Sequence, residues 1–104
     1  MEDAWIKFAK NDQLIMIANE CSRAANVLEH KDVEGARKAI ERGLDLIDRT
    51  VDDGRWQGQY GELLKFREAL AAQYLCPVSS SLRILIDWLA RYIERPKHVS
   101  FVRG

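Results

Sequence analysis

Apolar residues recur every three or four positions along most of this 104-residue chain, and this spacing restricts the folds open to it. The clearest example lies between Asp32 and Val51, where the spacing is continuous: Val33, Ala36, Ile40, Leu44, Ile47 and Val51. On an α-helix these steps place the apolar side chains on one face, which is stabilised by burial. Charged residues fill the opposite face, and Asp32 has the short carboxylate that is common at a helix N-cap. The pattern predicts a helix over residues 32–51.

Three further segments show the same periodicity. Residues 12–30 carry the stripe Leu14, Ile17, Ala18, Cys21, Ala24, Ala25 and Leu28. Residues 59–76 carry Tyr60, Leu63, Leu64, Leu70, Ala71, Tyr74 and Leu75, and residues 80–95 carry Leu82, Leu85, Ile86, Leu89, Tyr92 and Ile93. Pro77 and Pro96 follow the last two segments, and proline ends a helix because it lacks an amide hydrogen and clashes with the preceding turn. We therefore predict helices over these three ranges.

The connections between these helices are short. Residues 30–32 predict a tight reversal, and the glycine-bearing stretch 52–59 ends the second helix. Trp5 and Phe8 are out of phase with the first long helix, which predicts a short N-terminal helical segment and a break near Asn11, with Asp12 as the cap. Residues after Pro96 are expected to form an irregular tail. The prediction is an all-α single domain over residues 1–104, an up-down four-helix bundle.

Charge and composition argue against several classes of protein. Acidic and basic side chains balance at 16 each, which disfavours electrostatic binding to nucleic acid. No apolar run could span a bilayer, and the acidic N-terminus does not resemble a signal peptide, so we expect a cytoplasmic protein. Cys21 and Cys76 form no metal-binding pair, and we expect two buried, reduced thiols.

No motif for catalysis, metal binding or cofactor binding stands out. The chain has no Glu-x-x-His motif of the kind that di-metal bundles use, and the glycines at 54, 58 and 61 are not followed by a phosphate-binding lysine. Asp45, Asp48 and Asp52 share one side of the second helix, where a solvated acidic face is the simplest interpretation. We therefore predict no catalytic residue, no metal site, no cofactor and no small-molecule ligand.

Arg67 lies in the middle of the apolar stripe predicted for the third helix. A charge at such a position is costly unless it is paired. Its stem could lie along the core with the guanidinium at the rim, it could pair with Asp45 or Asp48, or the helix could face a groove that a partner fills.

Aromatic residues outside the main stripes are the other unusual feature. They could cover an end of the bundle, or they could form an exposed patch of the kind that marks an interaction surface. The candidate partner surface comprises Trp5, Phe8, Trp56, Tyr60, Arg67 and Trp88.

The spacing Arg-x6-His occurs twice, as Arg23 with His30 and Arg91 with His98. This spacing resembles the signature of the HEPN-domain ribonucleases, which are also helical bundles. The resemblance implies that the arginine would hold a phosphate and the histidine would move a proton. The alternative function is therefore an HEPN-like ribonuclease or a toxin–antitoxin component.

A second resemblance covers residues 13–93. The small-residue stripe of the first helix, the turn at Lys31-Asp32-Val33-Glu34 and the Leu63-Leu64-Lys65-Phe66-Arg67 run are similar to those of the flagellar export chaperones. Members of that family are cytoplasmic bundles that bind a helical tail of flagellin. The resemblance implies a non-enzymatic protein that acts by protein–protein contact, as a chaperone, adaptor or small assembly subunit.

The partner expected from the sequence is another protein or a second copy of the chain, since a homodimer would also bury the exposed aromatic residues. Nucleic-acid binding without catalysis is a weaker possibility, based on the basic residues of the C-terminal quarter: Arg83, Arg91, Arg95, Lys97 and Arg103.

Overall fold

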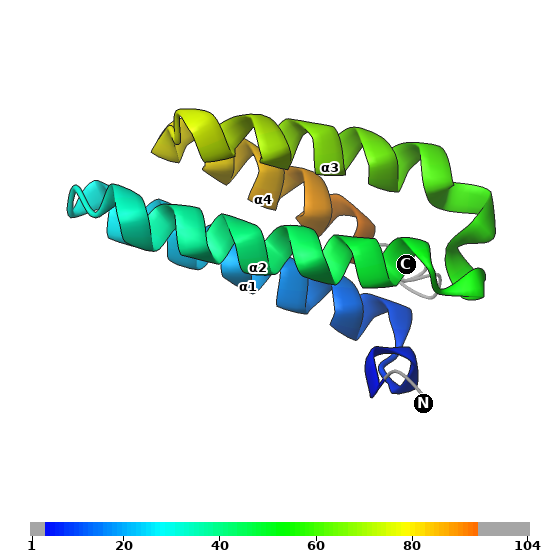
Figure 1. Ribbon diagram of the computed structural model, residues 1–104. Helices are drawn as coiled ribbons and strands as arrows, with labels where there is room; N and C mark the ends of the chain where they lie inside the picture. Colours follow the sequence, from blue (N-terminus) through cyan, green and yellow to red (C-terminus); the bar gives the residue numbers. More distant parts are fainter. Residues whose placement is uncertain (1–3, 94–104) are drawn as a thin grey trace, which may run out of the picture.

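A computed structural model describes residues 4–93 of the chain, and it contains four α-helices and two short 3-10 helices (Figure 1). In chain order these elements are η1 (Ala4–Lys7), α1 (Lys10–Glu29), α2 (Val33–Val51), η2 (Gly54–Gln59), α3 (Tyr60–Leu75) and α4 (Ser79–Ile93). No strand occurs within residues 4–93. The all-α class, the four helices and the short N-terminal helical segment are as predicted. The predicted tail and the stop at Pro96 lie outside the described residues.

Successive helices run in opposite directions and pack side by side (Figure 1). The closest packing is that of α1 against α2 and α4, followed by α2 against α3. The α3–α4 side is packed least. Each helix packs against two neighbours, and α3 has the loosest fit of the four.

The core is formed by one row of side chains from each helix. Alanines at positions 24, 25, 36 and 39 are fully buried, so α1 and α2 approach closely. Larger side chains fill the centre, among them Ile17, Ile40, Ile47, Leu70, Leu82 and Leu89. Full burial of one such aliphatic side chain contributes about 1.5–3 kcal/mol, so these rows supply most of the driving force for folding. The stripes predicted for α1 and α2 supply most of this core.

The α1–α2 turn has the predicted cap. The Asp32 carboxylate accepts a hydrogen bond from the Gly35 amide at 2.8 Å. On the other side of the turn, the Lys31 amide donates to the Leu28 carbonyl and the Asp32 amide donates to the Val27 carbonyl. Lys31 has a φ of 65°, in the left-handed region that usually favours glycine. The helix is therefore closed by a lysine in a strained conformation, which costs about 1–2 kcal/mol.

The start of α1 differs from the prediction. The helix begins at Lys10, because the Ala9 carbonyl accepts the first helical hydrogen bond from the Gln13 amide at 3.0 Å. Asp12 therefore lies inside the first turn and does not cap the helix. Its carboxylate still faces the positive end of the helix dipole, which explains why an acidic residue suits this position. The interruption between the two helical segments lies at Phe8 and Ala9, earlier in the sequence than predicted.

The third helix also differs from the prediction, in its orientation about its own axis. Phe66, which was outside the predicted stripe, is buried, and its ring stacks on Trp88 with the ring centroids 5.4 Å apart. Leu64 and Leu75, which were in the stripe, are 51% and 78% exposed. The predicted stripe was two rows wide, and only one row can face the core.

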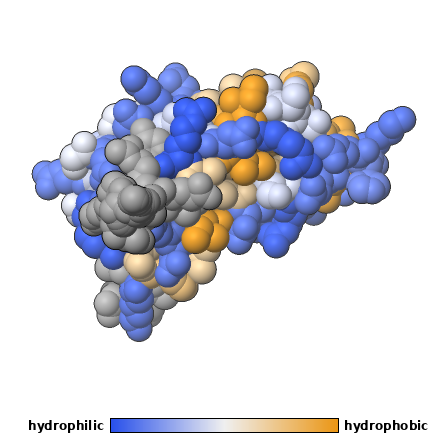
Figure 2. All heavy atoms as spheres, turned by 180° about the vertical axis from the view of Figure 1, so that it is seen from behind, coloured by the Kyte–Doolittle hydropathy of each residue, from blue (hydrophilic) through white to orange (hydrophobic). Residues whose placement is uncertain are grey.

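Several other large apolar side chains remain at the surface. The face seen from behind, with α1 and α4 toward the viewer, is mostly hydrophilic, and apolar side chains form a band across its middle (Figure 2). The exposed large hydrophobic residues in the described part of the chain are Phe8, Ile15, Val33, Leu64, Leu75, Val78 and Ile84. None of the helices in the described part of the chain is long and apolar enough to cross a membrane.

Candidate interaction surface

Two of the predicted surface residues, Trp5 and Trp56, are buried. Their exposed fractions are 4% and 3%, so they do not belong to an exposed patch. They cover the end of the bundle at which α1 begins and α2 ends, which is the alternative that the sequence left open. A buried indole N–H needs a hydrogen-bond acceptor, and both tryptophans have one.

Gln13 supplies one of these acceptors and links three segments. Its Oε1 accepts from the Trp56 indole N–H at 2.7 Å. Its Nε2 donates to the Trp5 carbonyl at 2.9 Å and to the Asp53 carboxylate at 3.1 Å. The Gln13 side chain is fully buried and its amide is well satisfied, so it joins η1 and η2 to α1.

Thr50 and Arg55 complete this end of the bundle. The Trp5 indole donates to the Thr50 hydroxyl at 2.9 Å, and that hydroxyl donates to the Leu46 carbonyl at 2.8 Å. Arg55 forms an ion pair with Asp53 at 2.6 Å and donates to the Phe8 carbonyl at 2.8 Å. The arrangement holds the N-terminal segment onto the bundle, and its buried polar groups are engaged with one another.

Asp53 is the titratable centre of this network. Hydrogen bonds from Arg55 and Gln13 hold the pKa of the Asp53 carboxyl well below its usual value, with the Arg55 guanidinium contributing most. Burial opposes this shift. The Asp53–Arg55 ion pair and the hydrogen bonds of Gln13 and Thr50 together hold η1 and η2 against α1 and α2.

The remaining predicted aromatic residues lie on different elements. Phe8 is 37% exposed and packs edge-on against Trp5, with the ring centroids 5.7 Å apart. Tyr60 is half-buried at the start of α3, and Trp88 is half-buried on α4. Trp88 stacks on Phe66, on the α3–α4 side. Phe8 and Tyr60 therefore lie at the end of the bundle where α1 and α3 begin, and Trp88 lies on the α3–α4 side.

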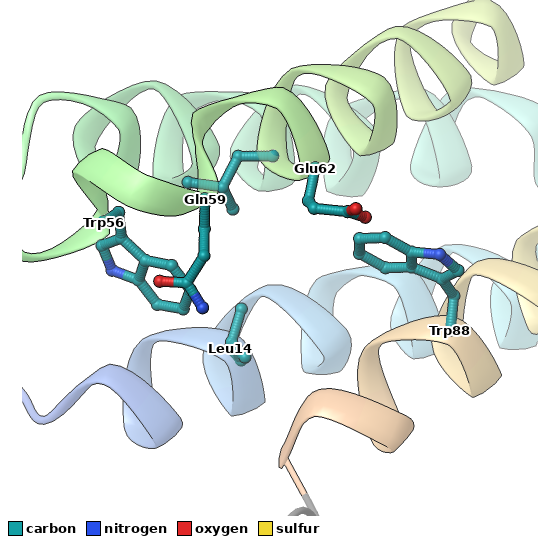
Figure 3. A pocket seen from close by; sticks show the side chains of 6 residues that line it. Leu14, Trp56, Gln59, Glu62 and Trp88 are labelled. Carbon is teal, nitrogen blue, oxygen red and sulfur yellow. The ribbon is translucent and has the colours of Figure 1, made fainter.

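A narrow cleft opens between η2, α1, α3 and α4 (Figure 3). Trp56 and Gln59 lie on one side of it and Trp88 on the other, with Glu62 directed over the Trp88 ring (Figure 3). The cleft is lined by Leu14, Trp56, Gln59, Glu62, Leu63 and Trp88. Its interior volume of about 10 Å³ accommodates one water molecule at most. The cleft is too small for an organic ligand.

Arg67 pairs with Asp48 of α2, which is the second of the three alternatives that the sequence left open. The two atoms Nε and Oδ1 are 2.6 Å apart, and a second contact of 3.3 Å joins Nη2 to Oδ2. The Arg67 side chain is 38% exposed, so this pair lies at the rim between α2 and α3. The hydrogen bond that Arg67 donates to the Asp48 carboxylate raises the pKa of Arg67, which keeps the guanidinium charged.

An uncovered row of side chains runs along α3 beside this rim. We define the outer row as Leu64, Glu68, Ala71 and Leu75, which are spaced by four, three and four residues. Each residue follows by one position a residue of the row that packs toward the core and α2: Leu63, Arg67, Leu70 and Tyr74. The outer row therefore points about 100° away from that contact. Its two leucines are among the most exposed apolar side chains described.

The contacts of α3 with α2 locate the outer row on the α2–α3 face, which is toward the viewer in Figure 1. The Tyr74 hydroxyl donates to the Glu41 carboxylate at 2.8 Å. Arg37 donates to the Tyr74 carbonyl at 2.9 Å and to the Leu75 carbonyl at 3.1 Å. Glu41, Arg37 and Asp48 thus form the α2 border of this face.

Within residues 4–93, the two residues of the Arg23–His30 spacing have separate partners. Arg23 pairs with Glu20 at 3.1 Å, and the His30 ring contacts the Asn26 carbonyl at 3.0 Å. His98 lies outside the described residues. Within residues 4–93, no cluster of three or more His, Cys, Asp or Glu side chains could hold a metal ion.

The two cysteines are free thiols in different environments. Burial raises the pKa of Cys21 to about 12, with a smaller contribution from the nearby charge of Glu20. Cys76 is exposed, so the prediction of a second buried thiol was wrong. The reason is the α3–α4 connection, where Cys76 follows the last turn of α3 and precedes Pro77.

Comparison of the chain with models of protein families, with curated proteins and with solved structures finds no match. The resemblances to flagellar export chaperones and to HEPN-domain ribonucleases therefore stay predictions.

Proposed function

We propose that this protein acts by binding another protein, and that a helix of the partner lies against the outer row of α3. The observation that carries the proposal is the exposure of Leu64 and Leu75 at helical spacing on one side of α3. Helices that dock in grooves use apolar contacts at such intervals of three and four residues. A helix with apolar side chains on more than one side is usually covered on more than one side.

The energetics suit a reversible complex. Covering a leucine side chain contributes at most about 1.5–3 kcal/mol, and both leucines are partly shielded already. The outer row would therefore supply a modest part of the binding energy, and neighbouring polar contacts would add orientation. These features fit an adaptor, a chaperone or a small assembly subunit, in which binding must be reversible.

The proposal is tested by capturing binding proteins from cells that produce this chain. The double variant Leu64→Gln/Leu75→Gln removes the apolar contact without adding charge, and glutamine preserves helix propensity. Ile15→Gln is the matched control, because Ile15 is 40% exposed on α1. Circular dichroism and thermal unfolding establish that each variant folds.

We expect the native chain and Ile15→Gln to retain the same partner, and the double variant to lose it. Light scattering on the purified chain shows whether the partner is a second copy. If the double variant retains every protein that the native chain retains, and its oligomeric state is the same, the outer row is not the interaction surface.

A further inference from the structure

The middle of the exposed face of α3 carries two charges of opposite sign. We define the charged row of α3 as four exposed residues spaced by four, three and four positions: Gly61, Lys65, Glu68 and Ala72. The side chains that α3 buries in the core are Leu63, Phe66 and Leu70. The charged row is rotated from them by about half a turn around the helix axis, so it points directly away from the core. Because α3 lies at one edge of the bundle, its neighbours leave this row open (Figure 1).

Lys65 and Glu68 are both available to a partner. Neither side chain forms an ion pair with another residue in the range 4–93. A partner helix with charges of one sign would place a like charge against one of the two residues, which disfavours binding. A complementary helix must instead present a negative charge level with Lys65 and a positive charge level with Glu68, about one turn further along.

A second copy of α3 that runs antiparallel to the first has this order of charges. If a two-fold axis crosses α3 midway between Lys65 and Glu68, Lys65 of each copy lies level with the partner's Glu68. The same symmetry places Gly61 of each copy level with the partner's Ala72, so no bulky side chain keeps the two helices apart. Each pairing occurs twice in such a contact. The charged row is therefore complementary to itself in charge and in size.

The apolar residues of the outer row fit the same register. Leu64 of each copy lies within one helical turn of the partner's Ala71, on the flank of the helix pair that faces α2. The two helices overlap over about 20 Å, which is nearly the full length of the 16 residues of α3. One helix face per copy covers less than the roughly 800 Å² per partner of a standard interface, so the dimer is weak and reversible.

From these observations we infer that the partner of α3 is a second copy of the chain, and that the two α3 helices pack antiparallel with Lys65 of each copy against the partner's Glu68. This inference rests on the proposed function, because it assumes that a helix covers the outer row. It goes further by identifying that helix and its register.

Charge exchange tests this register without removing an apolar contact. Lys65→Glu and Glu68→Lys each place like charges opposite one another in a homodimer. A mixture of the two variants restores both attractive pairings, because one chain then carries two acids where the other carries two lysines. Arg23→Glu is the matched control, since it makes the same charge change on α1, which packs against α2 and α4. Sedimentation equilibrium measures each dissociation constant, and circular dichroism establishes that each variant folds.

We expect the native chain to dimerise at concentrations between about 1 µM and about 1 mM, and Arg23→Glu to dimerise equally well. Lys65→Glu and Glu68→Lys alone should each weaken the dimer about tenfold, because two attractive pairs become two repulsive pairs. Their mixture should regain at least the affinity of the native chain. The Leu64→Gln/Leu75→Gln variant should also weaken the dimer, whereas Ile15→Gln should leave it unchanged.

The outcomes separate this inference from the proposed function. A native chain that stays monomeric up to about 1 mM overturns the inference, and the capture experiment with the leucine variant still decides whether another protein covers the outer row. A dimer that ignores both charge exchanges forms on another face and also overturns the inference. A mixture that dimerises no more tightly than either variant alone contradicts the antiparallel register.

Discussion

Asp53 shows how strongly a few contacts can constrain a single residue. The carboxylate is 3% exposed, which is rare for an aspartate without an opposite charge. Here Arg55 supplies that charge, and the Gln13 side chain and the Arg55 amide donate further hydrogen bonds. From the sequence, Asp53 was only one of several acids near the end of α2. The largest contribution to its low pKa comes from Arg55, and a further hydrogen bond comes from Gln13, which is 40 residues away along the chain.

We predict that Asp53→Asn lowers the free energy of unfolding at pH 7 by about 1–3 kcal/mol, because Arg55 and Gln13 lose a charged acceptor. The pKa of Asp53 is lower in the folded state than in the unfolded state. The contribution of this carboxylate is therefore complete above the unfolded pKa of about 4, and it is lost as the pH falls below that value.

Urea denaturation between pH 7 and pH 2 measures this effect. The difference between the native protein and Asp53→Asn should be largest near neutral pH and should shrink as the pH falls. Asp52→Asn is the control, since Asp52 is an exposed neighbour. A difference that stays constant with pH would show that the charge of Asp53 does not stabilise the fold.

At the scale of the elements, α3 illustrates the limits of periodicity. Its apolar residues lie in two adjacent rows, and either row could face a core. The choice depends on α4, because Phe66 is buried when its ring stacks on Trp88. It also depends on α2, because Arg67 reaches Asp48 only in this orientation. Both partners are distant in the sequence, so the pattern within α3 could not select the row.

We predict unequal effects on stability for two substitutions on α3. Phe66→Ala should lower the free energy of unfolding by about 3–5 kcal/mol, because it removes a buried ring and leaves a cavity. Leu64→Ala should change it by less than about 1 kcal/mol, because that side chain is already half exposed. Chemical denaturation of both variants measures the difference. A larger loss for Leu64→Ala would mean that α3 is oriented as the sequence stripe predicted.

At the scale of the whole molecule, the N-terminal segment closes one end of the bundle. Trp5 is the residue that anchors it, through a hydrogen bond to Thr50 of α2 and through its carbonyl to Gln13 of α1. A domain of this size has a total stability of about 5–15 kcal/mol, so one well-buried indole accounts for a large share. The segment before α1 is therefore part of the fold.

We predict that Trp5→Ala lowers the free energy of unfolding by about 3–5 kcal/mol, because it leaves a cavity and removes the indole donor to Thr50. Phe8→Ala is the matched control, and it should cost less than about 1 kcal/mol because Phe8 lies at the surface. Thermal and urea unfolding measure both. Equal losses for the two variants would show that the Trp5 indole has no special role.

The sequence by itself determined the helices, their order and the cap at Asp32, because these depend on spacing and on side chains close to one another along the chain. It also identified the acidic side of the second helix and the charge at Arg67. Only the tertiary structure decided that Trp5 and Trp56 are buried and that Leu64 and Leu75 are exposed. The physical reason is that burial is a property of neighbours in space, and those neighbours come from helices whose relative rotation no local pattern encodes.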